Sequence, residues 1–491
     1  MAAALGPALR AATKLGYGIG QSAEGLNTGA FGAFLLFYYN QVLGLSGTLA
    51  GLALGIALIF DAVTDPLMGS ISDNWRSRLG RRHPFMYAAC LPLGLSFYFL
   101  FSPPALGEVG LFVWLTTFAV ATRGALTLFQ VPHAALGAEL TQGFLERSNV
   151  VAYRQFFSTF GGLAAFVVGF GVFFVATPEQ PQGQFNAAAY PGYAATLAIL
   201  MAVTTFVSAH STRSRISLLY QPTARTGALG VAGVFGRTLR EARAVLRNAS
   251  FRWLVTGVLI AFLMVGVDNA LNLYMNTFFW ELESNELLFF FVATPLGLLI
   301  GYFFTAKLHD LFDKRPALAW GTAFWACGQI VPVVLRLLGW FPENDTTALI
   351  VTLVSIKFAQ GLGMAQAAVS FSSMVADIAD EHELLVGRRQ EGVFFAAVSF
   401  ANKATTGVGS IIAGVALDLI EWPRGAHVQS AADVPEAVIV NLGVVYGPVV
   451  AGFGFFAIWC YSKYGLTKVS HGDIVKQLAE RRALSAADGR G

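Results

Sequence analysis

The sequence predicts an all-α membrane protein of about twelve transmembrane helices, arranged as two pseudo-symmetric six-helix halves. Hydrophobic residues make up 55% of the 491-residue chain and charged residues only 12%, whereas a soluble domain carries about 25% charged residues. Apolar runs of about 20 residues, the length that crosses a bilayer as a helix, recur along the whole chain. One long polar and basic segment, residues 213–250, interrupts them near the middle.

The expected helices follow in chain order from the centres of these apolar runs. In the first half the centres lie near Phe31, Leu58, Pro92, Phe118, Phe166 and Leu197. In the second half they lie near Ala261, Leu298, Phe324, Phe358, Gly407 and Gly454. The chain therefore divides into an N-terminal bundle over residues 1–212, a basic linker over 213–250, a C-terminal bundle over 251–462 and a tail over 463–491.

Charged residues are distributed unevenly between alternate loops. Lysine and arginine gather in one set of connecting segments, whereas the other set is acidic, with Arg424 almost its only cation. The positive-inside rule then places both termini and the linker in the cytoplasm, at an inner or plasma membrane. We interpret the linker arginines as part of a connecting helix rather than a lipid sensor. The 3 cysteines lie far apart in apolar segments, so we expect neither a disulfide framework nor a zinc site.

A charged loop recurs at equivalent places in the two halves. The second expected helix is followed by GSISDNWRSRLGRR and the eighth by AKLHDLFDKR, each with an aspartate before a basic cluster. Two six-helix halves that share this loop resemble the major facilitator superfamily, in which the halves rock about a site near mid-membrane. Asp73 and Arg81 would then belong to a cytoplasmic gate, and a plain helix-capping turn is the alternative.

Two carboxylates, Asp61 and Asp65, stand one helical turn apart in the middle of an apolar run. Thr64 lies near the same face, and Pro66 frees the carbonyl of Ala62 from its helical hydrogen bond. Because an intramembrane charge costs about 3 kcal/mol or more, such a pair indicates a functional site. Carboxylate and hydroxyl oxygens are hard ligands suited to Na⁺, and two neighbouring carboxylates also suit a shared proton.

The fourth expected helix offers further oxygen ligands. Thr127 and Gln130 share one of its faces, and Thr127 would supply another oxygen to the cation. For this threonine the alternative is a hydroxyl bonded back to its own helix. For the two aspartates the alternative is a structural ion pair with Arg123 or Lys403.

Four stretches together resemble the glycoside–pentoside–hexuronide:cation symporter family, of the melibiose permease-like type. They are DAVTDPLMG…SRLGRRHPF, FQVPHAALGAEL, ERSNVVAYRQFF and MVADIADEHELLVGRRQEG, in the family's order over nearly the whole chain. The resemblance implies Na⁺- or H⁺-coupled symport by alternating access. It implies a cation (metal) site at Asp61, Thr64, Asp65 and Thr127, a lysine beside the central cavity at Lys403, and a cytoplasmic charge network of Arg147, Asp377, Asp380 and Arg389.

The positions that hold the sugar in melibiose-type members differ here. The first-helix acid corresponds to Gly25, with Glu24 just before it, and Gln130 replaces the acid of the fourth helix. The family's fifth-helix arginine falls one position away, at Arg154, with Gln155 in the strict alignment. The candidate substrate-binding residues are therefore Glu24, Gln130, Arg154 and Lys403. The cation site is retained in the pattern, whereas the melibiose-type sugar platform is not.

This pattern also resembles the sodium-coupled lysophospholipid symporters, which gives an alternative cargo. The leading interpretation is symport of a sugar, glycoside or sugar acid, and the alternative is the same mechanism with a lysophospholipid. No metalloprotease, nucleophile-elbow or paired-cysteine motif points to an enzyme. We expect contact with membrane lipid, a monomer, no nucleic-acid partner and no cofactor besides the coupling ion. Arg123, Asp268 and Lys357 stay open: the cations could neutralise a buried acid or contact an anionic substrate.

Overall fold

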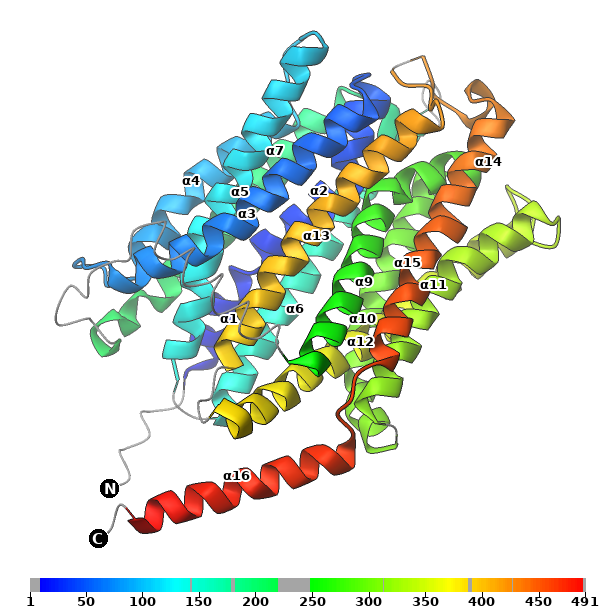
Figure 1. Cartoon of the computed structure of the whole chain (residues 1–491). Coiled ribbons are helices and arrows are strands. Elements are labelled where there is room, and N and C mark those ends of the chain that lie inside the picture. The colour runs from blue at the N-terminus through cyan, green and yellow to red at the C-terminus, as the bar shows by residue number, and fades with distance from the viewer. Residues whose placement is uncertain are drawn as a thin grey trace.

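The computed structural model describes residues 9–141, 144–177, 182–219, 248–311, 313–386, 391–425 and 427–488. Within these ranges the chain forms one elongated bundle of helices (Figure 1). The first half of the chain lies on one side of the bundle and the second half on the other, with α3 and α13 side by side between them. The last helix, α16, lies across the lower end in Figure 1. We call that end the terminal end and the opposite end the distal end.

The helices of the first half match the expected runs. They are α1 (Ala11–Ile19), α2 (Ser22–Phe37), α3 (Gly47–Asn74), α4 (His83–Leu100), α5 (Glu108–Glu139), α6 (Phe144–Val168) and α7 (Ala189–Thr212). The expected basic linker begins with a short 3-10 helix, Arg213–Leu218, and its greater part lies outside the described residues.

The helices of the second half begin after this segment. They are α9 (Ala249–Tyr274), α10 (Ser284–Leu311), α11 (Lys314–Leu337), α12 (Thr347–Val386), α13 (Glu391–Leu419), α14 (Glu436–Val444), α15 (Val450–Ser462) and α16 (Lys468–Asp488). In the described part of the chain, 9 helices are long and apolar enough to cross a membrane. The other expected spans coincide with α2, α4 and α13.

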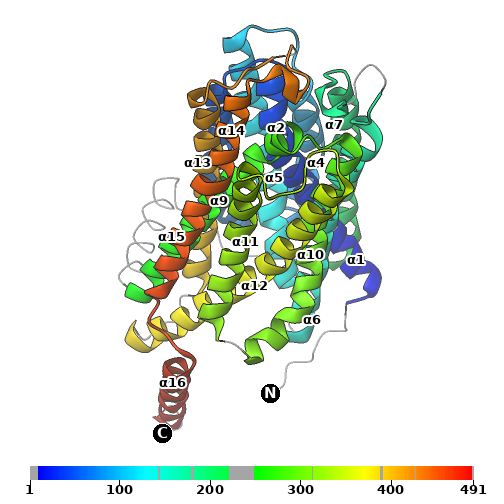
Figure 2. The same ribbon diagram turned by 90° about the vertical axis from the view of Figure 1, so that its right-hand side faces the viewer.

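The two halves repeat one packing pattern. In the first half α2 packs on α6, α3 on α5 and α4 on α7, and in the second half α9 packs on α13, α10 on α12 and α11 on α15. The first membrane helix of each half also ends in a π-helical turn, Tyr38–Val42 after α2 and Met275–Phe279 after α9. Figure 2, turned by 90°, shows α9, α11 and α15 beside one another in the second half. This repetition is the internal symmetry expected of transporters built from two repeats.

Glycines allow α3 and α13 to approach closely across the two halves. A Cβ added at Gly51 would lie 2.6 Å from the carbonyl oxygen of Ser410, and one added at Gly47 would lie 2.6 Å from that of Gly414. Gly55 continues this face toward mid-membrane, where an added Cβ would meet Ile411 at 2.5 Å. Small residues at spacings of four are the usual means by which membrane helices reach backbone contact.

Hydrogen bonds between the halves gather at the distal end. The carboxylate of Asp418 on α13 accepts hydrogen bonds from the Ser46 hydroxyl (3.1 Å) and from the backbone N–H groups of Gly47 (3.0 Å) and Thr48 (2.8 Å). An acid from one half thus caps the N-terminus of α3 in the other. Further pairs across the halves at this end are Asn40–Tyr274, Gln41–Trp422, Glu108–Arg424 and Gln184–Thr277.

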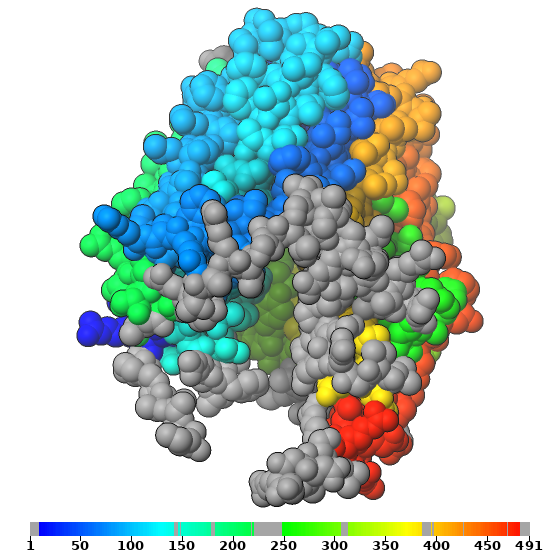
Figure 3. All heavy atoms as spheres, turned by 60° about the vertical axis from the view of Figure 1, so that its left-hand side comes forward, coloured from blue at the N-terminus to red at the C-terminus, as the bar shows by residue number. Residues whose placement is uncertain are grey.

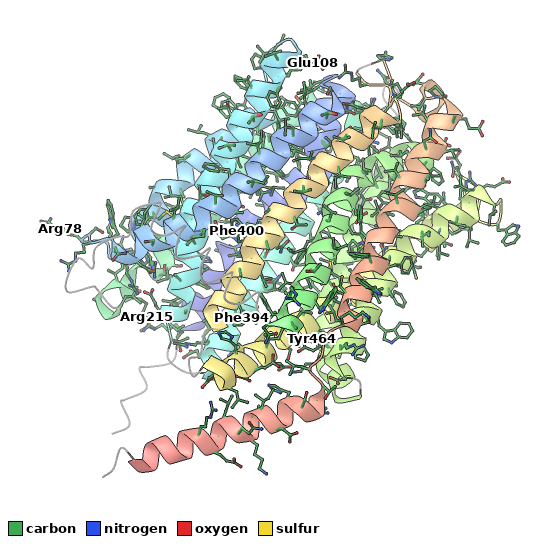
Figure 4. All side chains as sticks on the ribbon, viewed as in Figure 1. Arg78, Glu108, Arg215, Phe394, Phe400 and Tyr464 are labelled. Atoms are coloured by element: carbon green, nitrogen blue, oxygen red, sulfur yellow. The ribbon has the colours of Figure 1, made fainter. Side chains whose placement is uncertain are left out.

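The halves are separated toward the terminal end. Figure 3 shows the surface hollowed between the first half, in blue and cyan, and the second half, with atoms of the second half visible at depth. Figure 4 places Glu108 at the distal end, and Arg78, Arg215 and Tyr464 toward the terminal end. This conformation is therefore closed at the distal end and open toward the terminal end.

Candidate functional site

A cluster of charged side chains lies where α3, α5 and α13 meet, halfway along α3. Asp61 is 1% exposed, and its Oδ1 accepts a hydrogen bond of 2.6 Å from the hydroxyl of Thr127 on α5. The same hydroxyl lies 3.0 Å from Asp65 Oδ1. A hydroxyl carries one proton, so it donates to one carboxylate at a time and presents its lone pairs beside both. Three oxygen-bearing side chains thus converge on one point.

Two cations neutralise this carboxylate pair. The Nζ atom of Lys403 lies 2.5 Å from Asp65 Oδ2 and 3.0 Å from Asp61 Oδ2, so the ammonium bridges both acids. Arg123 Nη1 lies 3.7 Å from Asp61 Oδ2, and its guanidinium sits over the ring of Phe31, 4.3 Å from the ring centroid. Two acids and two bases balance, as a cluster with buried charge requires. The carboxylates of Asp61 and Asp65 thus take part both in the ion pair with Lys403 and in the oxygen cluster with Thr127.

Thr64 and Thr127 use their hydroxyls in opposite ways. The Thr64 hydroxyl donates back to its own helix, lying 3.0 Å from the carbonyl oxygen of Phe60 and 3.3 Å from that of Asp61. Back-bonding was the alternative for Thr127, and the structure places it at Thr64 instead. Within the described residues there is no group of three or more His, Cys, Asp or Glu side chains of the kind that hold a metal ion. The cluster suits an alkali cation with mixed oxygen ligands, or a proton.

A cavity of about 310 Å³ lies between the halves, lined by α2 and α6 on one side and by α9, α10, α11 and α12 on the other. The wall from the first half carries hydroxyl, amide and carboxylate groups and one aromatic ring, and the wall from the second half carries polar groups and most of the aromatic rings. The polar side chains are Glu24, Thr28, Gln155, Ser158, Thr159, Asp268, Asn269, Asn272, Thr294 and Lys357, and the rings belong to Phe166, Phe290, Phe291 and Trp325. Such a mixture in a concave site of this size is typical of small-molecule binding.

Of the four substrate-binding residues expected from the sequence, Glu24 lines this cavity. Its Oε2 accepts a hydrogen bond of 2.5 Å from the Ser158 hydroxyl, and its Oε1 lies 3.3 Å from that of Thr28. A carboxylate that is held by neutral donors keeps free lone pairs for the hydroxyl groups of a ligand.

The other three residues lie elsewhere. Gln155 takes the cavity position on α6, as the strict alignment indicated, whereas Arg154 is not among the lining residues and interacts with the Tyr17 hydroxyl. Gln130 on α5 is half-buried and is not among the residues that line the cavity. Lys403 is also outside the lining, because its ammonium is engaged by the two aspartates. Successive side chains of a helix are rotated by about 100° around its axis, so an alignment error of one position moves a side chain out of the cavity.

A second buried polar cluster, in the second half, borders the same cavity. Asp268 on α9 accepts hydrogen bonds of 2.6 Å from Gln329 and 2.5 Å from the Tyr446 hydroxyl. Lys357 on α12 lies 3.8 Å from the same carboxylate oxygen. The sequence drew attention to the aspartate and the lysine as charges in apolar runs. It gave no signal for Gln329 and Tyr446, because an amide and a phenol are ordinary residues in such helices.

The charged residues expected to form the gate pair within their own halves in this conformation. Arg82, the neighbour of Arg81, contacts Asp73, and both arginines contact Glu139. In the second half Asp377 pairs with Lys314 at 2.7 Å, and His471 of α16 lies 3.2 Å from Asp380. Arg147 donates to the Thr141 carbonyl at 3.1 Å, and Arg389 lies outside the described residues. The expected network, which the resemblance implies for the state in which the halves are held together at this end, stays a prediction for that other conformation.

The sequence is similar to known transporters over nearly its whole length. The family described as "MFS/sugar transport protein" matches residues 16–468. The inner membrane symporter YicJ of Escherichia coli is 24% identical, with 95% of this chain and 94% of that protein covered. The glucuronide carrier protein homolog of the same species is 23% identical, with 96% of both covered. The sodium-dependent lysophosphatidylcholine symporter 1 of Gallus gallus is 23% identical, with 92% and 87% covered.

Solved structures of transporters match the fold. A crystal structure of the nucleoside transporter NupG matches with a TM-score of 0.60 at 13% identity, covering 92% of this chain and 99% of that one. The xylose transporter XylE from E. coli, in an inward-open conformation, matches with a TM-score of 0.59 at 14% identity, covering 93% and 96%. These matches confirm the predicted all-α major facilitator fold. Because the family match covers almost the entire chain, the protein belongs to the MFS/sugar transport protein family, the glycoside–pentoside–hexuronide:cation symporters of the major facilitator superfamily, and is a cation-coupled secondary transporter in the membrane rather than an enzyme.

Proposed function

We propose that this protein carries a sugar, glycoside or sugar acid together with Na⁺ or H⁺, by alternating access between the two halves. The observation that carries the proposal is the cavity between the halves, whose walls combine a carboxylate, hydroxyls and amides with aromatic rings. Polar groups of this kind bond paired sugar hydroxyls, and ring faces stack on the apolar side of a sugar. The cavity volume of about 310 Å³ falls at the small end of ligand pockets.

The coupling ion is proposed to bind at Asp61, Asp65 and Thr127. Lys403 holds these carboxylates in the present conformation, so the ammonium and the coupling ion compete for the same oxygens. Entry of the ion releases Lys403, which belongs to α13 in the other half, from α3. The ion therefore binds one arrangement of the halves better than the other. A ligand with such a difference in affinity shifts the population between conformations, and reciprocal linkage couples it to the substrate.

Arg123 offers a physical connection between the ion site and the cavity. Its guanidinium lies 3.7 Å from Asp61 and stacks on Phe31 of α2, the helix that also carries Glu24. A change of charge at Asp61, on ion binding, would therefore alter the contact of Arg123 with α2. The positive-inside rule supports a cytoplasmic position for the terminal end, which makes the present conformation inward-facing.

A lysophospholipid is the second candidate substrate. Its support is the similarity to the lysophosphatidylcholine symporter and a separate, almost wholly apolar groove of about 540 Å³ between α10, α11 and α12. That groove shares no lining residue with the central cavity. The polar walls of the central cavity favour the sugar, because buried polar groups left facing an acyl chain would lose their hydrogen bonds.

Thermal stability of the purified protein tests the cargo and the ion together. We expect one class of sugar or glycoside to raise the melting temperature, and Na⁺ or a lower pH to increase that rise, because ligands that bind only the folded state stabilise it by about 2.7 kcal/mol at 100 times their Kd. A panel of glycosides, uronides and lysophosphatidylcholine is compared with and without Na⁺ at two pH values. Stabilisation by the lysolipid alone would favour the second candidate, and a response to neither ion would contradict the coupling site.

The two threonines provide a matched pair of variants for the ion site. Thr127→Val is expected to raise the ion concentration for half-maximal uptake about tenfold, because it removes an oxygen ligand worth about 1.4 kcal/mol. Thr64→Val is expected to change it less than about threefold, because its hydroxyl is already bonded within α3. Both values come from uptake into proteoliposomes over a range of ion concentrations. Equal effects of the two substitutions would remove Thr127 from the site.

A further inference from the structure

Lys357 is a buried cation in the wall of the central cavity. Its side chain comes from α12 and the residue is 6% exposed. Among the described residues that line the cavity it is the one cation, whereas Glu24 and Asp268 are the acids. Burying an ammonium without close hydrogen-bond partners is unfavourable. The groups around Lys357 therefore indicate whether it has a structural or a ligand-binding role.

The described neighbours of Lys357 use little of its hydrogen-bonding capacity. An ammonium has three donors. The Nζ atom lies 3.4 Å from the Tyr446 hydroxyl and 3.8 Å from Asp268 Oδ1, both longer than the usual N–H···O distance of about 2.7–3.2 Å. Two aromatic rings also lie near the ammonium, with the centroid of Phe290 at 5.2 Å and that of Trp325 at 5.8 Å. Rings stabilise the charge without accepting a directed hydrogen bond.

Asp268 explains how the ammonium is held in this position. Its Oδ1 atom is occupied by short hydrogen bonds from Gln329 and Tyr446, which fix the carboxylate in place. At 3.8 Å it still compensates the charge of Lys357, without taking up the lysine donors. Asp268 is thus a positioning residue: it partly offsets the burial of the ammonium and leaves donors of Lys357, a residue of the cavity lining, available to a ligand.

The two walls of the cavity differ in charge, which would orient a bound ligand. Glu24 and the hydroxyl of Ser158 lie on the first half, while Lys357 lies on the second. A carboxylate on the ligand would be repelled by Glu24 and attracted by Lys357, whereas ligand hydroxyls suit the wall around Glu24. A single cation with an acid nearby suits one negative charge better than two.

We propose that Lys357 is an anion subsite, which binds a carboxylate or other singly charged group of a hydroxylated substrate while Asp268 positions it. The proposal rests on the proposed function as a sugar-type symporter and specifies the substrate as an anionic sugar derivative. It adds a contact on the second half, so that the substrate joins both halves of the molecule. Binding then requires the halves to stand at one separation, as a transported ligand must.

The test compares two probes that differ only at C6. Methyl β-D-glucoside carries a neutral hydroxymethyl group there, and methyl β-D-glucuronide carries a carboxylate. Affinities are measured calorimetrically on the purified full-length protein in Na⁺. We expect the wild-type protein to bind the glucuronide more tightly. Lys357→Met should weaken the glucuronide roughly 10- to 100-fold, because a charge-assisted hydrogen bond is lost, and the glucoside less than about threefold.

Two further variants separate charge from packing. Lys357→Arg is expected to keep the preference for the glucuronide, because it retains the cation. Arg336→Met removes a half-buried cation from the distal end of α11, where it contacts the carbonyl of Pro342, and should leave both affinities unchanged. If Lys357→Met does not fold, the double variant Asp268→Asn, Lys357→Met removes both charges of the pair and answers the same question.

Each result decides between the alternatives. If Lys357→Met weakens the binding of both probes equally, the anion subsite is overturned and the sugar symporter is not. The same conclusion follows if the wild-type protein binds the glucoside but not the glucuronide. Binding of neither probe, while Na⁺ still stabilises the protein, overturns the sugar cargo and the subsite together. Glucose 6-phosphate, whose phosphate carries close to two negative charges near neutral pH, serves as a third probe. Binding tighter than that of the glucuronide and lost in Lys357→Met would overturn the preference for a singly charged group, whereas weaker binding would support it.

Discussion

Asp61→Asn is expected to abolish cation-driven accumulation of substrate. Asp61 is the more deeply buried of the two carboxylates and contacts Thr127 at 2.6 Å and Lys403 at 3.0 Å. Without its charge, Lys403 and Arg123 face Asp65 alone, and the cluster carries a net positive charge that repels an incoming cation. Removing one partner of a buried charged cluster costs about 3–5 kcal/mol. Ion affinity should fall by at least about 100-fold, about 2.7 kcal/mol, because a charged oxygen ligand is lost and the net positive charge opposes the ion.

Uptake into proteoliposomes with an imposed Na⁺ or pH gradient measures this effect. Exchange of substrate without a gradient should persist, because the variant does not touch the cavity lining. Asp61→Asn, Lys403→Gln removes the excess positive charge and should regain stability lost in the single variant, with coupling still absent. Asp345→Asn is the matched control, since Asp345 is an exposed residue of the α11–α12 loop in a left-handed conformation that asparagine tolerates. Accumulation by Asp61→Asn at the wild-type level would exclude Asp61 from the ion site.

Gly51→Leu is expected to reduce uptake more than about tenfold by preventing closure at the distal end. Even a Cβ at this position would lie 2.6 Å from the Ser410 carbonyl oxygen of α13, a backbone atom that cannot turn aside. A leucine therefore forces α3 and α13 apart and breaks the hydrogen bonds between Asp418 and the start of α3. The protein should populate conformations that are open at the distal end.

Spin labels at exposed distal positions measure the separation directly. Leu106 of the α4–α5 loop and Trp340 of the α11–α12 loop belong to opposite halves and are 39% and 77% exposed. With cysteines at both positions in a background free of Cys90, Cys327 and Cys460, the distance between labels should lengthen in Gly51→Leu. Gly452→Leu is the matched control, because a Cβ at Gly452 of α15 meets no atom within 4 Å. An unchanged distance with normal uptake would mean that this contact does not govern closure.

The expected ion site shows what a helical pattern predicts well. Asp61 and Asp65 share a face because they are one turn apart within one helix, which is a local property. Their proximity to Thr127, Arg123 and Lys403 was named from the sequence as two competing interpretations, a cation site or an ion pair. The two describe the same atoms, since Lys403 bridges both acids in this conformation. A sequence carries no information on the conformational state, so it cannot show that one set of atoms serves both roles.

Other positions required the packed molecule. Arg154 and Gln155 are neighbours in sequence, yet only Gln155 reaches the cavity, because its face is chosen by how α6 packs on α2. Gln329 and Tyr446 gather around Asp268 from helices far apart in the chain, so no spacing announces them. His471 of α16 contacts Asp377 and Asp380 although the tail was expected only as a cytoplasmic extension.

The sequence by itself determined the class of molecule, the order of its helices and the residues with a reason to be functional. These follow from composition, from run length and from the high free energy of a charge in an apolar helix, all of which are local quantities. Only the tertiary structure decided which half each cavity wall comes from, that Thr127 and not Thr64 faces the acids, and that the halves meet at the distal end. Those outcomes depend on side-chain direction and on glycine-mediated helix contacts between distant segments, which are set when the helices pack together.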